Sequence, residues 1–377
     1  MKLSASLFAN LEDVEELWRN LEVKADLHVY QTYDWIADWY ELIGKPKGTK
    51  PCLIVLNDEC QQPLMLLPLA VERCGLCRRL VWMGAEFVDY HAPILMPDAD
   101  ARLSTTDFDA IWQVIAAKLA DVDYADFQRQ PDMIGHQTNP MLGGQITPCS
   151  HGAHHTDLVG EWSSYYASKR GKRTRHNDRR KRRKLESEGE LSFLVAADND
   201  DIDRLLSVLI TQKQAYAKAL NERCLVTQPG YRPFLQRLAK RGVKDGSILL
   251  CGLDLDGEIL AAQWGAVYKK RLYSIVSSYS QAKHGKLSPG DMLLHDMMRW
   301  CYDNGVEVFD FTYGDEAYKE PWCEHRVTLY RTAIPLTARG AVYVYALWGM
   351  MSAVRWAKNR EWLVSLHRSF RKLVYST

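Results

Sequence analysis

The sequence predicts an α/β protein with two similar halves, and three observations support this prediction. The order of helix-like and strand-like segments in residues 1–155 returns in residues 191–338. A basic segment at 156–190 separates the halves, and a helical extension at 339–377 follows them. At 377 residues the chain is long enough for two domains with separate cores, because domains most often hold about 100–150 residues.

The first half begins with helices and continues with strands. Residues 13–22 and 34–44 carry aromatic and aliphatic residues at helical spacing. Later apolar runs predict strands at 51–58, 62–73 and 78–84, then a helix at 108–120 and a strand at 123–130. This order describes one α/β unit.

The second half repeats this order of elements, although not the residues themselves. It predicts helices at 201–220 and 230–242, antiparallel strands at 247–255, 258–268 and 271–279, a helix at 288–305 and a strand at 306–312. The repetition favours a duplicated fold, with the basic segment as a bridging helix between the copies.

Composition indicates a soluble protein of a reducing compartment. Apolar residues make up 47% and charged residues 25% of the chain. Acidic residues interrupt the N-terminus early, so it lacks the apolar core of a signal peptide, and we expect a cytoplasmic location. The nine cysteines form no dense framework, which is typical of reduced thiols.

One cysteine pair has the spacing of zinc ligands. Cys74 and Cys77 form a CxxC motif, and a composite site with Cys149, His151, His154 and His155 is conceivable. The alternative is a tight hairpin, because strand-like sequence flanks the motif on both sides. We favour the hairpin and expect no metal.

The basic segment is the most unusual feature of a chain whose formal net charge is only +1. Residues 168–184 hold eleven Lys and Arg, one Asp and no residue from the apolar set. Three interpretations stay open: a nucleic-acid contact, a localisation signal, or a helix that rests its charges on water, acids or an anionic ligand. We favour the third, because few aromatic residues interleave the charges.

The extension begins with an apolar run at 341–353, followed by six basic residues and one acid between Arg355 and Lys372. Thirteen residues are too few to span a bilayer. We expect a helical lid packed on the domains, with a membrane-surface or partner-binding helix at 341–372 as the alternative.

Three stretches carry a resemblance to a known family. Residues 287–322 combine Ser-Pro-Gly at a helix start, a Gly at its end, and then Phe-Asp-Phe, Gly-Asp-Glu, Tyr-Lys and Trp. With the basic stretch ending in KLESEGELSF and the segment MGAEFVDYHAPIL, they resemble GNAT-type acyltransferases of the CelD-like kind, with FemAB-type transferases as more distant relatives. The resemblance covers most of residues 50–335.

This resemblance implies two tandem GNAT-like domains, with mixed central sheets flanked by helices, that transfer an acyl group from an acyl thioester to an amine or hydroxyl. Acyl-CoA is the expected cosubstrate. The family's phosphate loop is reduced here to KLSPGDM, in which only Gly290 of its glycines is present. Coenzyme A is therefore an expectation drawn from the family.

The residues themselves also favour an anion site at this helix start. Unpaired amides and the helix macrodipole attract negative charge, and Gly290 allows close approach of a ligand to the backbone. Lys283, His284 and Lys286 add positive charge nearby. The predicted cofactor-binding residues are Lys286, Ser288, Gly290, Asp291 and Met292. The alternative is that Ser288 only caps the helix ahead of Pro289.

The predicted strand 306–312 and the loop after it supply the candidate chemistry. In a strand, Phe309 and Phe311 share one face, so Asp310 points to the other. An attacking amine must lose a proton, and Glu316 or Asp315 is the candidate base. Tyr318 is the candidate acid for the leaving thiolate, and Lys319 the candidate anion or oxyanion contact. Alternatively, an Asp310–Lys319 ion pair fixes the loop.

The first half offers further candidates in VDYHAPI. His91 is a second possible base, because an imidazole titrates near neutral pH, although a loop histidine satisfied by a neighbour explains it as well. Asp89, Tyr90, Asp315 and Trp322 are the predicted substrate-binding residues, with Asp89 and Tyr90 on the acceptor side of a cleft between the domains.

Three functions follow from these observations. The first is acyl transfer from an acyl-CoA or an acyl-carrier thioester to a small-molecule or saccharide acceptor. The second is a FemAB-like transferase that uses aminoacyl-tRNA, which the basic segment favours. The third is an inactive module that keeps the fold, which the reduced phosphate loop favours.

Overall fold

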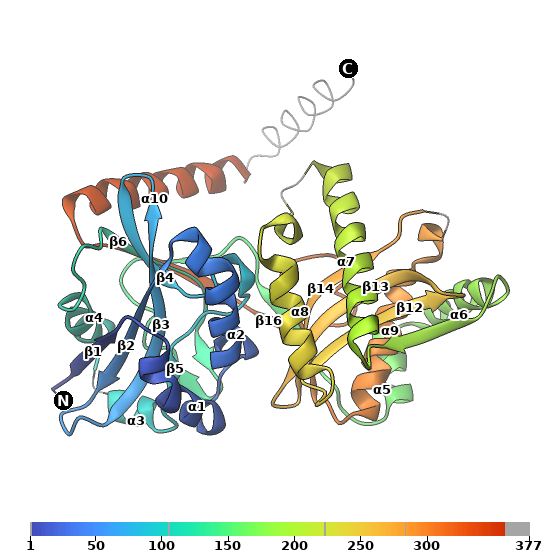
Figure 1. The fold of residues 1–377 in the computed structure, drawn as a ribbon, viewed down its shortest axis with the longest axis horizontal. Helices are drawn as coiled ribbons and strands as arrows, with labels where there is room; N and C mark the ends of the chain where they lie inside the picture. The colour runs from blue at the N-terminus through green and yellow to red at the C-terminus, as the bar shows by residue number, and fades with distance from the viewer. Residues whose placement is uncertain (1, 105, 222–223, 283, 359–377) are drawn as a thin grey trace, which may run out of the picture.

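Two mixed sheets, each covered by helices, lie side by side (Figure 1). The computed structural model describes residues 2–104, 106–221, 224–282 and 284–358. The first sheet has the order β1-β2-β3-β4-β6-β17-β9, with β5 against β3, and the second has the order β11-β12-β13-β14-β15-β10-β16. The predicted α/β architecture is confirmed.

The first domain is built from residues near the N-terminus and from one late strand. Its strands are β1 (Ser4–Phe8), β2 (Lys50–Asn57), β3 (Pro63–Cys74), β4 (Cys77–Trp82), β5 (Ile94–Leu95), β6 (Tyr124–Pro131), β9 (Ile146–Pro148) and β17 (Leu329–Pro335). Its helices are α1 (Glu15–Lys24), α2 (Tyr33–Trp39), α3 (Ala99–Leu103) and α4 (Phe108–Ala116). A small ribbon of β7 (Met133–Ile134) and β8 (Gln137–Thr138) follows β6.

The second domain holds the basic segment and the candidate site. Its strands are β10 (Ala153–Asp157), β11 (Leu191–Val195), β12 (Ile248–Leu255), β13 (Glu258–Tyr268), β14 (Arg271–Tyr279), β15 (Val308–Tyr313) and β16 (His325–Val327). Its helices are α5 (Trp162–Lys169), α6 (Lys172–Glu186), α7 (Asn199–Leu220), α8 (Tyr231–Gly242) and α9 (Pro289–Asp303).

Local sequence explains several of these boundaries. Asp198 caps α7 by accepting hydrogen bonds from the amides of Asp200 and Asp201 at 2.9 and 3.0 Å. Pro289 occupies the first turn of α9, where its missing amide hydrogen costs nothing. The CxxC motif is the predicted tight hairpin, because β3 ends at Cys74 and β4 begins at its partner Cys77.

The duplication is visible in the topology of the two sheets. In each domain four antiparallel strands lead through a helix to a fifth strand, which runs parallel to the fourth. The parallel pairing is short in both: Arg79–Leu80 with Tyr124–Ala125 in the first sheet, and Arg271–Tyr273 with Val308–Asp310 in the second. Beyond these few residues the fourth and fifth strands part, which opens each sheet at one end.

Each sheet is completed by a strand from the other half of the sequence. The strand β17, at 329–335, pairs with β6 and β9 in the first sheet, whereas β10, at 153–157, pairs with β15 and β16 in the second. The sequence analysis placed domain boundaries at residues 155 and 338 without this exchange of strands. Those boundaries stay a prediction. The exchange therefore links the two domains through backbone hydrogen bonds in both sheets.

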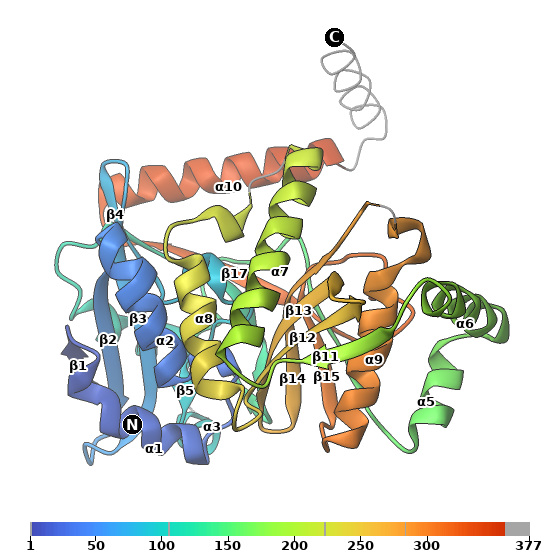
Figure 2. The same cartoon turned by 45° about the vertical axis from the view of Figure 1, so that its right-hand side comes forward.

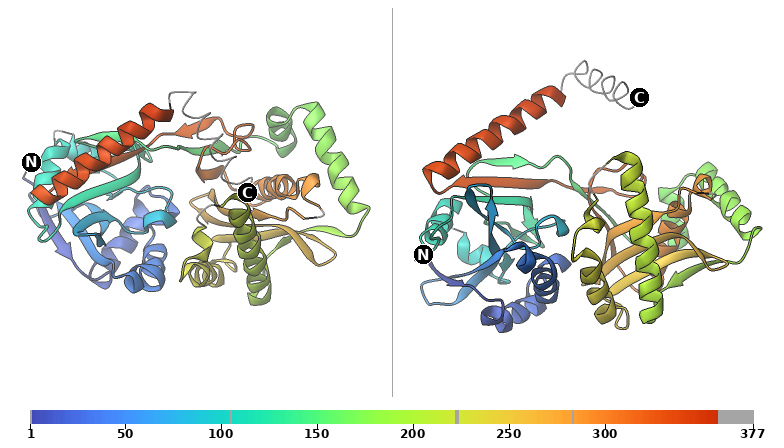
Figure 3. Two further views of the ribbon diagram at one scale, coloured as in Figure 1. Left: turned by 90° about the horizontal axis from the view of Figure 1, so that it is seen from above. Right: turned by 45° about the horizontal axis from the view of Figure 1, so that its top comes forward.

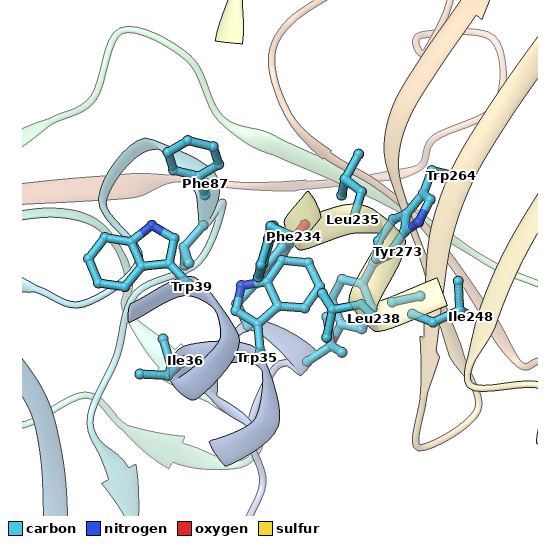
Figure 4. Close-up of a cluster of buried hydrophobic side chains, with 14 of the residues drawn as sticks. Trp35, Ile36, Trp39, Phe87, Phe234, Leu235, Leu238, Ile248, Trp264 and Tyr273 are labelled. Atoms are coloured by element: carbon cyan, nitrogen blue, oxygen red, sulfur yellow. The ribbon is translucent and has the colours of Figure 1, made fainter. Parts of the chain in front are cut away.

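A shared aromatic core also joins the domains. Trp35 of α2 packs edge-on against Phe234 of α8 and Trp264 of β13, with ring centroids 5.2 and 6.0 Å apart (Figure 4). All three side chains are almost fully buried. Aromatic burial of this kind contributes strongly to packing, so the two domains form one hydrophobic unit.

The basic segment forms a helix, α6, at the outer end of the second domain, next to α5 and α9 (Figures 1 and 2). It was expected to bridge the two copies, but it lies on the far side of the second domain from the first sheet. Its residues explain this place, because a helix with only Leu185 buried cannot fill an apolar interface.

The C-terminal extension includes α10 (Ala338–Lys358), which lies along the first domain (Figure 3). Tyr343 stacks on Tyr124 with ring centroids 4.6 Å apart, and Arg339 pairs with the buried Asp123 at 2.9 Å. The helix is therefore packed on a domain, as the lid interpretation expects. Residues 359–372 of the predicted 341–372 contact surface lie outside the described residues. None of the described helices is long and apolar enough to cross a membrane.

The strand exchange predicts that one substitution after residue 330 weakens the first domain. Thr332 is fully buried and pairs with both Phe127 and Ile146. Proline at this position removes an amide donor from the middle of the sheet, which leaves a buried acceptor unpaired at a cost of about 1–3 kcal/mol. Hydrogen exchange in Thr332→Pro should therefore be faster in 124–131 than in 248–255.

The matched control is Thr332→Val, which keeps the side-chain shape and the amide. Equal loss of protection in both strands would contradict the assignment of β17 to the first sheet.

Candidate active site at the first turn of α9

A fully buried carboxylate, Asp310 of β15, joins the two domains. It accepts hydrogen bonds from the hydroxyl of Tyr90 at 3.0 and 3.1 Å and pairs with Arg271 at 2.8 Å. Phe309 and Phe311 face the opposite core, as the strand alternation predicts. Burial raises the pKa of the Asp310 carboxyl, although the positive charge of Arg271 opposes this effect.

The contacts of Tyr90 extend this cluster into the first domain. Its ring stacks on His28 at a centroid distance of 4.1 Å, and His28 Nδ1 lies 3.1 Å from the hydroxyl of Tyr273. Asp89 next to it accepts a hydrogen bond from Tyr30 at 3.1 Å and pairs with Arg129 at 3.3 Å. Asp89 and Tyr90 therefore lie at the domain boundary, in a tightly packed network.

The loop after β15 is fixed by a buried lysine. Lys319 donates hydrogen bonds to the carbonyls of Thr312, Tyr313 and Gly314 at 3.0–3.3 Å, and it pairs with Glu316 at 2.8 Å. The suggested Asp310–Lys319 ion pair is not formed, because each side chain has a different partner. Lys319 therefore holds the loop, and its ammonium group is already used.

The two acids of this loop differ in their surroundings. Asp315 accepts hydrogen bonds from His154 at 2.7 Å and from the amide of Gly152 at 3.2 Å, and it pairs with Arg326 at 3.4 Å. Burial opposes ionisation of Asp315, but these contacts outweigh it and hold its pKa well below the usual range. Glu316 is more exposed, and hydrogen bonding to Lys319 outweighs its burial and lowers its pKa.

A cavity of about 290 Å³ lies between β14 and α9, beside the point where β14 leaves β15. We call it the α9 cavity. Its lining is mostly apolar along α9 and polar along the strands: Gln263, Ser274, Ser277, Ser278, Tyr279, Gly285, Ser288, Gly290, Asp291, Leu293, Leu294, Met297 and Tyr318.

The predicted anion-binding residues divide around this cavity. Ser288, Gly290 and Asp291 line it at the first turn of α9, at the positive end of the macrodipole. The amides of Ser288 and Asp291 donate to the carbonyls of Gly285 and Ser288 at 3.1 Å, which leaves the amide of Gly290 to face a ligand. Met292 is buried and Lys286 is exposed, and neither lines it. His284 is buried 3.8 Å from Glu188, and Lys283 lies outside the described residues.

A second cavity, of about 430 Å³, lies on the other side of the same helix turn. We call it the α6 cavity, because α5 and α6 form one wall and α9 the other. Its lining consists of Trp162, Ser163, Tyr166, Arg170, Arg175, Asp178, Arg179, Lys181, Arg182, Leu287, Ser288, Asp291, Met292, His295 and Trp322. Trp322, a predicted substrate-binding residue, is therefore separated from Asp89 and Tyr90.

His91 lies in a different place from its two sequence neighbours. It lines a polar cavity of about 540 Å³ in the first domain, where β4 leaves β6. Its Nδ1 lies 3.0 Å from the carbonyl of Gln128, so Nδ1 carries the hydrogen and Nε2 is a bare acceptor. Burial and the charge of Arg129 lower the pKa of His91 to about 3. The structure does not bring His91 close to the loop after β15.

The structure does not assemble the residues of the conceivable composite zinc site. Cys74 and Cys77 lie in the β3–β4 hairpin of the first domain. His151 and His154 both contact Asp315. Among the described residues a different group, His155, Asp157 and His325, places potential ligand atoms within 4.8 Å of one another. Their spacing across β10 and β16 was not recognised in the sequence.

Sequence reasoning also missed several residues that shape the site. Arg271, Tyr273 and His28 complete the cluster around Asp310, and Trp162, Tyr166 and Lys181 shape the α6 cavity. Arg271 could have been found in the sequence, because it is a charged residue at the start of an apolar strand. The partners of the others come from distant segments, which no local pattern indicates.

The sheets, with the parting parallel strands and the cavity at the first turn of α9, define an acyltransferase-type fold. Residues 172–320 match the sequence model of an acetyltransferase (GNAT) domain. The match covers less than half of the chain, and it agrees with the sequence resemblance for this segment. Comparison with curated protein sequences gives no significant match.

Solved structures share the fold over almost the whole chain. FemX superposes with a TM-score of 0.57 at 9% identity, covering 88% of this chain and 96% of FemX. A conserved protein of unknown function from Bacteroides thetaiotaomicron gives 0.53 at 12% identity, covering 86% and 97%. The L-PGS of Bacillus licheniformis gives 0.51 at 12% identity, covering 92% and 97%. At these identities the likeness shows the fold alone.

The buried pair at the domain boundary predicts a large effect on stability. Replacing Arg271 with methionine leaves the Asp310 carboxylate buried beside Tyr90 without a cation, at a cost of about 3–5 kcal/mol. Urea unfolding measures the loss. The double variant Arg271→Met with Asp310→Asn should lose much less unfolding free energy than Arg271→Met, because no uncompensated buried charge remains.

The neighbouring Lys270 provides a matched control. Its pair with Glu307 is 66% exposed on both sides, so Lys270→Met should cost no more than about 1 kcal/mol. Equal losses for Arg271→Met and Lys270→Met would contradict the role of the buried pair.

Stability should also depend on pH through His91. Its folded pKa of about 3 lies below the unfolded value of about 6.5, so the unfolded state binds the additional proton between these values. The stabilisation is complete above about pH 6.5 and is lost as the pH falls through this window. The unfolding free energy of His91→Gln should fall less with pH than that of the unchanged protein, by about 0.7 kcal/mol between pH 7 and 6 and about 1.2 kcal/mol between pH 6 and 5. Parallel profiles would show that His91 is not held neutral.

Proposed function

We propose that this protein is an acyltransferase that moves an acyl group from a CoA or carrier-bound thioester to an amine or hydroxyl of a small-molecule or saccharide acceptor. The observation that carries the proposal is the α9 cavity. It joins an apolar slot to the first turn of a helix, which suits a thioester arm that ends in a phosphate. The GNAT match of residues 172–320 supports the same chemistry.

The geometry suggests how a donor would lie. Its phosphate would meet Ser288 and Gly290, where a Cβ on Gly290 would stand 3.4 Å from the ring of Tyr279. The arm would extend along Leu293, Leu294 and Met297 toward Tyr318. Holding both reactants in this way supplies much of the rate in an acyl transfer.

Two residues of the loop after β15 are proposed for the proton transfers. Glu316 is proposed as the base, directly or through water, because its carboxylate is ionised and exposed in the loop that also carries Tyr318. Tyr318 is exposed, and a tyrosine hydroxyl is protonated at neutral pH, so it can donate the proton that a leaving thiolate takes up. Tyr318 lines the cavity and is proposed as the acid.

The other predicted catalytic residues are proposed to position this site. Asp310 is enclosed by Tyr90 and Arg271, and Lys319 is bound to three carbonyls and Glu316. Both fix β15 and the loop that carries Glu316 and Tyr318. Asp89 and Tyr90 are proposed to fix the first domain against this loop.

A second candidate function is transfer from aminoacyl-tRNA. The outward face of α6 favours it, because its exposed cations have no carboxylate partner among the described residues: Lys172, Arg173, Arg180, Arg183 and Lys184. Such a face attracts phosphates in a salt-dependent manner.

Calorimetry with acetyl-CoA, a longer acyl-CoA and bulk tRNA tests the proposal. Binding of thioesters supports acyl transfer, and binding of tRNA alone at physiological salt favours the second candidate. Ser277→Trp should weaken acetyl-CoA binding at least about tenfold, because Ser277 is exposed and the larger ring fills the α9 cavity. Ser192→Trp, at an exposed position of β11 outside the cavity, is the control.

Turnover tests the proposed acid. In Tyr318→Phe, thiol release from acetyl-CoA with a panel of amines and amino sugars should fall about 100-fold, with little change in acetyl-CoA affinity. Full turnover in Tyr318→Phe and Glu316→Gln would place the proton transfers elsewhere. Failure to bind every thioester would leave an inactive module with this fold.

A further inference from the structure

We infer that the α6 cavity is a nucleotide site, in which α5 and α6 hold the adenosine bisphosphate end of a CoA donor. This inference rests on the proposed function and deepens it, because it selects free CoA over a carrier-bound phosphopantetheine arm. It also assigns a role to the inward-facing part of the basic segment.

The first observation is that the two cavities meet. Ser288 and Asp291 line both, so the α9 and α6 cavities touch at the first turn of α9. Lys181 of α6 donates a hydrogen bond to Ser288 Oγ at 2.7 Å, which brings a cation to this junction. A ligand with a diphosphate at the junction can therefore extend into both cavities.

The second observation is an aromatic wall. Trp162 and Tyr166 of α5 stack at a centroid distance of 5.2 Å and an angle of 14°, and Trp322 stacks on Tyr166 at 6.1 Å and 21°. The guanidinium of Arg170 lies 5.4 Å from the ring centre of Trp322. Trp322 is buried behind this stack, so the half-buried rings of Trp162 and Tyr166 are the ones that a nucleobase could contact.

The third observation is unpaired positive charge inside the cavity. Two of its five cations are neutralised, because Arg170 pairs with Asp178 and Arg182 pairs with Asp296. Arg175, Arg179 and Lys181 have no carboxylate partner among the described residues. Against them stands the exposed carboxylate of Asp291.

The state of Arg175 points to a ligand as well. Its Nε is buried and has no hydrogen-bond partner in the described part of the chain, and the same is true of Arg170 Nε. Buried polar groups normally find partners, so these donors favour an anion in the cavity. A phosphate at the 3′ position of the ribose, together with the diphosphate, supplies the acceptors.

The chemistry of the cavity therefore distinguishes two donors. A carrier-bound arm has a single phosphodiester and no base, and it would leave the aromatic wall and the inner arginines without partners. Coenzyme A has a base, a 3′-phosphate and a diphosphate in the order that the cavity and the junction provide. At about 430 Å³ the cavity has the size of common ligand sites.

Calorimetry on the full-length protein tests the inference with adenosine 3′,5′-bisphosphate, 4′-phosphopantetheine and CoA. Adenosine 3′,5′-bisphosphate should bind without the rest of the CoA molecule. CoA itself should bind at least about tenfold more tightly than 4′-phosphopantetheine. Equal affinities of CoA and 4′-phosphopantetheine would overturn the inference.

Two double variants of the same helix separate site binding from bulk charge. Arg175→Gln with Arg179→Gln removes two inner cations and should weaken bisphosphate binding by about 30-fold. Arg180→Gln with Arg183→Gln removes the same charge from the outer face and should change it less than about threefold. Equal losses would show a general charge effect and overturn the inference. The inference is also overturned if Arg175→Gln with Arg179→Gln leaves bisphosphate binding unchanged and weakens only the binding of an RNA that ends in adenosine.

The Ser277→Trp variant distinguishes this inference from the proposed function. Its filled α9 cavity should leave bisphosphate binding intact. If the bisphosphate binds through Arg175 and Arg179 while no acyl-CoA is turned over, the nucleotide site stands and the proposed function fails. Suppose instead that acyl-CoA is turned over, and that Arg175→Gln with Arg179→Gln changes neither the affinity for acyl-CoA nor the affinity for the bisphosphate. The nucleotide site is then wrong and the proposed function stands.

Discussion

The buried contact among Asp310, Arg271 and Tyr90 is the constraint on which the site depends. Arg271 and Asp310 lie on the parallel strands β14 and β15 at the few residues where these strands still pair. Their ion pair therefore fixes the point at which the strands part and the α9 cavity begins. Because Tyr90 comes from the first domain, the same carboxylate also sets the position of that domain. A buried charge with two directional partners tolerates little displacement, so it specifies geometry as well as contributing to stability.

The exchanged strands explain how a duplicated fold came to act as one body. Without β10, the strand β15 would have an open edge on one side, and without β17 the same would hold for β6. Open edges expose unpaired backbone groups, so each domain needs a strand from the other half of the chain. The two equivalent gaps have diverged in chemistry. The gap beside β14 is mostly apolar, whereas the gap beside β4 is polar and holds the neutral His91. The duplication therefore supplied two clefts of different polarity, and the mostly apolar one lies in the second domain.

Local sequence predicted most elements because their signals are local. The meanders 51–84 and 247–279 are short apolar runs separated by turn residues, and Pro289 and Gly305 delimit α9. The helices and strands there therefore agree with the structure within a few residues. The exchanged strands β10 and β17 were not predicted, because their pairing depends on segments more than 150 residues away. The site shows the same division. Ser288, Gly290 and Tyr318 were found from the helix start and the loop, whereas Arg271 and Trp162 act through tertiary contacts. The partner of Asp310 was misassigned because Lys319 is closer in sequence but binds carbonyls.

The basic helix shows why a charge pattern alone cannot locate a site. Almost every residue of α6 is polar, so no apolar stripe reveals which side faces the protein. The orientation is set by a few tertiary contacts: Leu185 enters the core, Lys181 bonds Ser288, and Arg182 pairs with Asp296. These contacts turn Arg175 toward an aromatic wall and leave Arg180 and Arg183 in water. The same residue type therefore has two environments along a single helix. Only the inner one adjoins the first turn of α9, where a diphosphate and a thioester arm would meet.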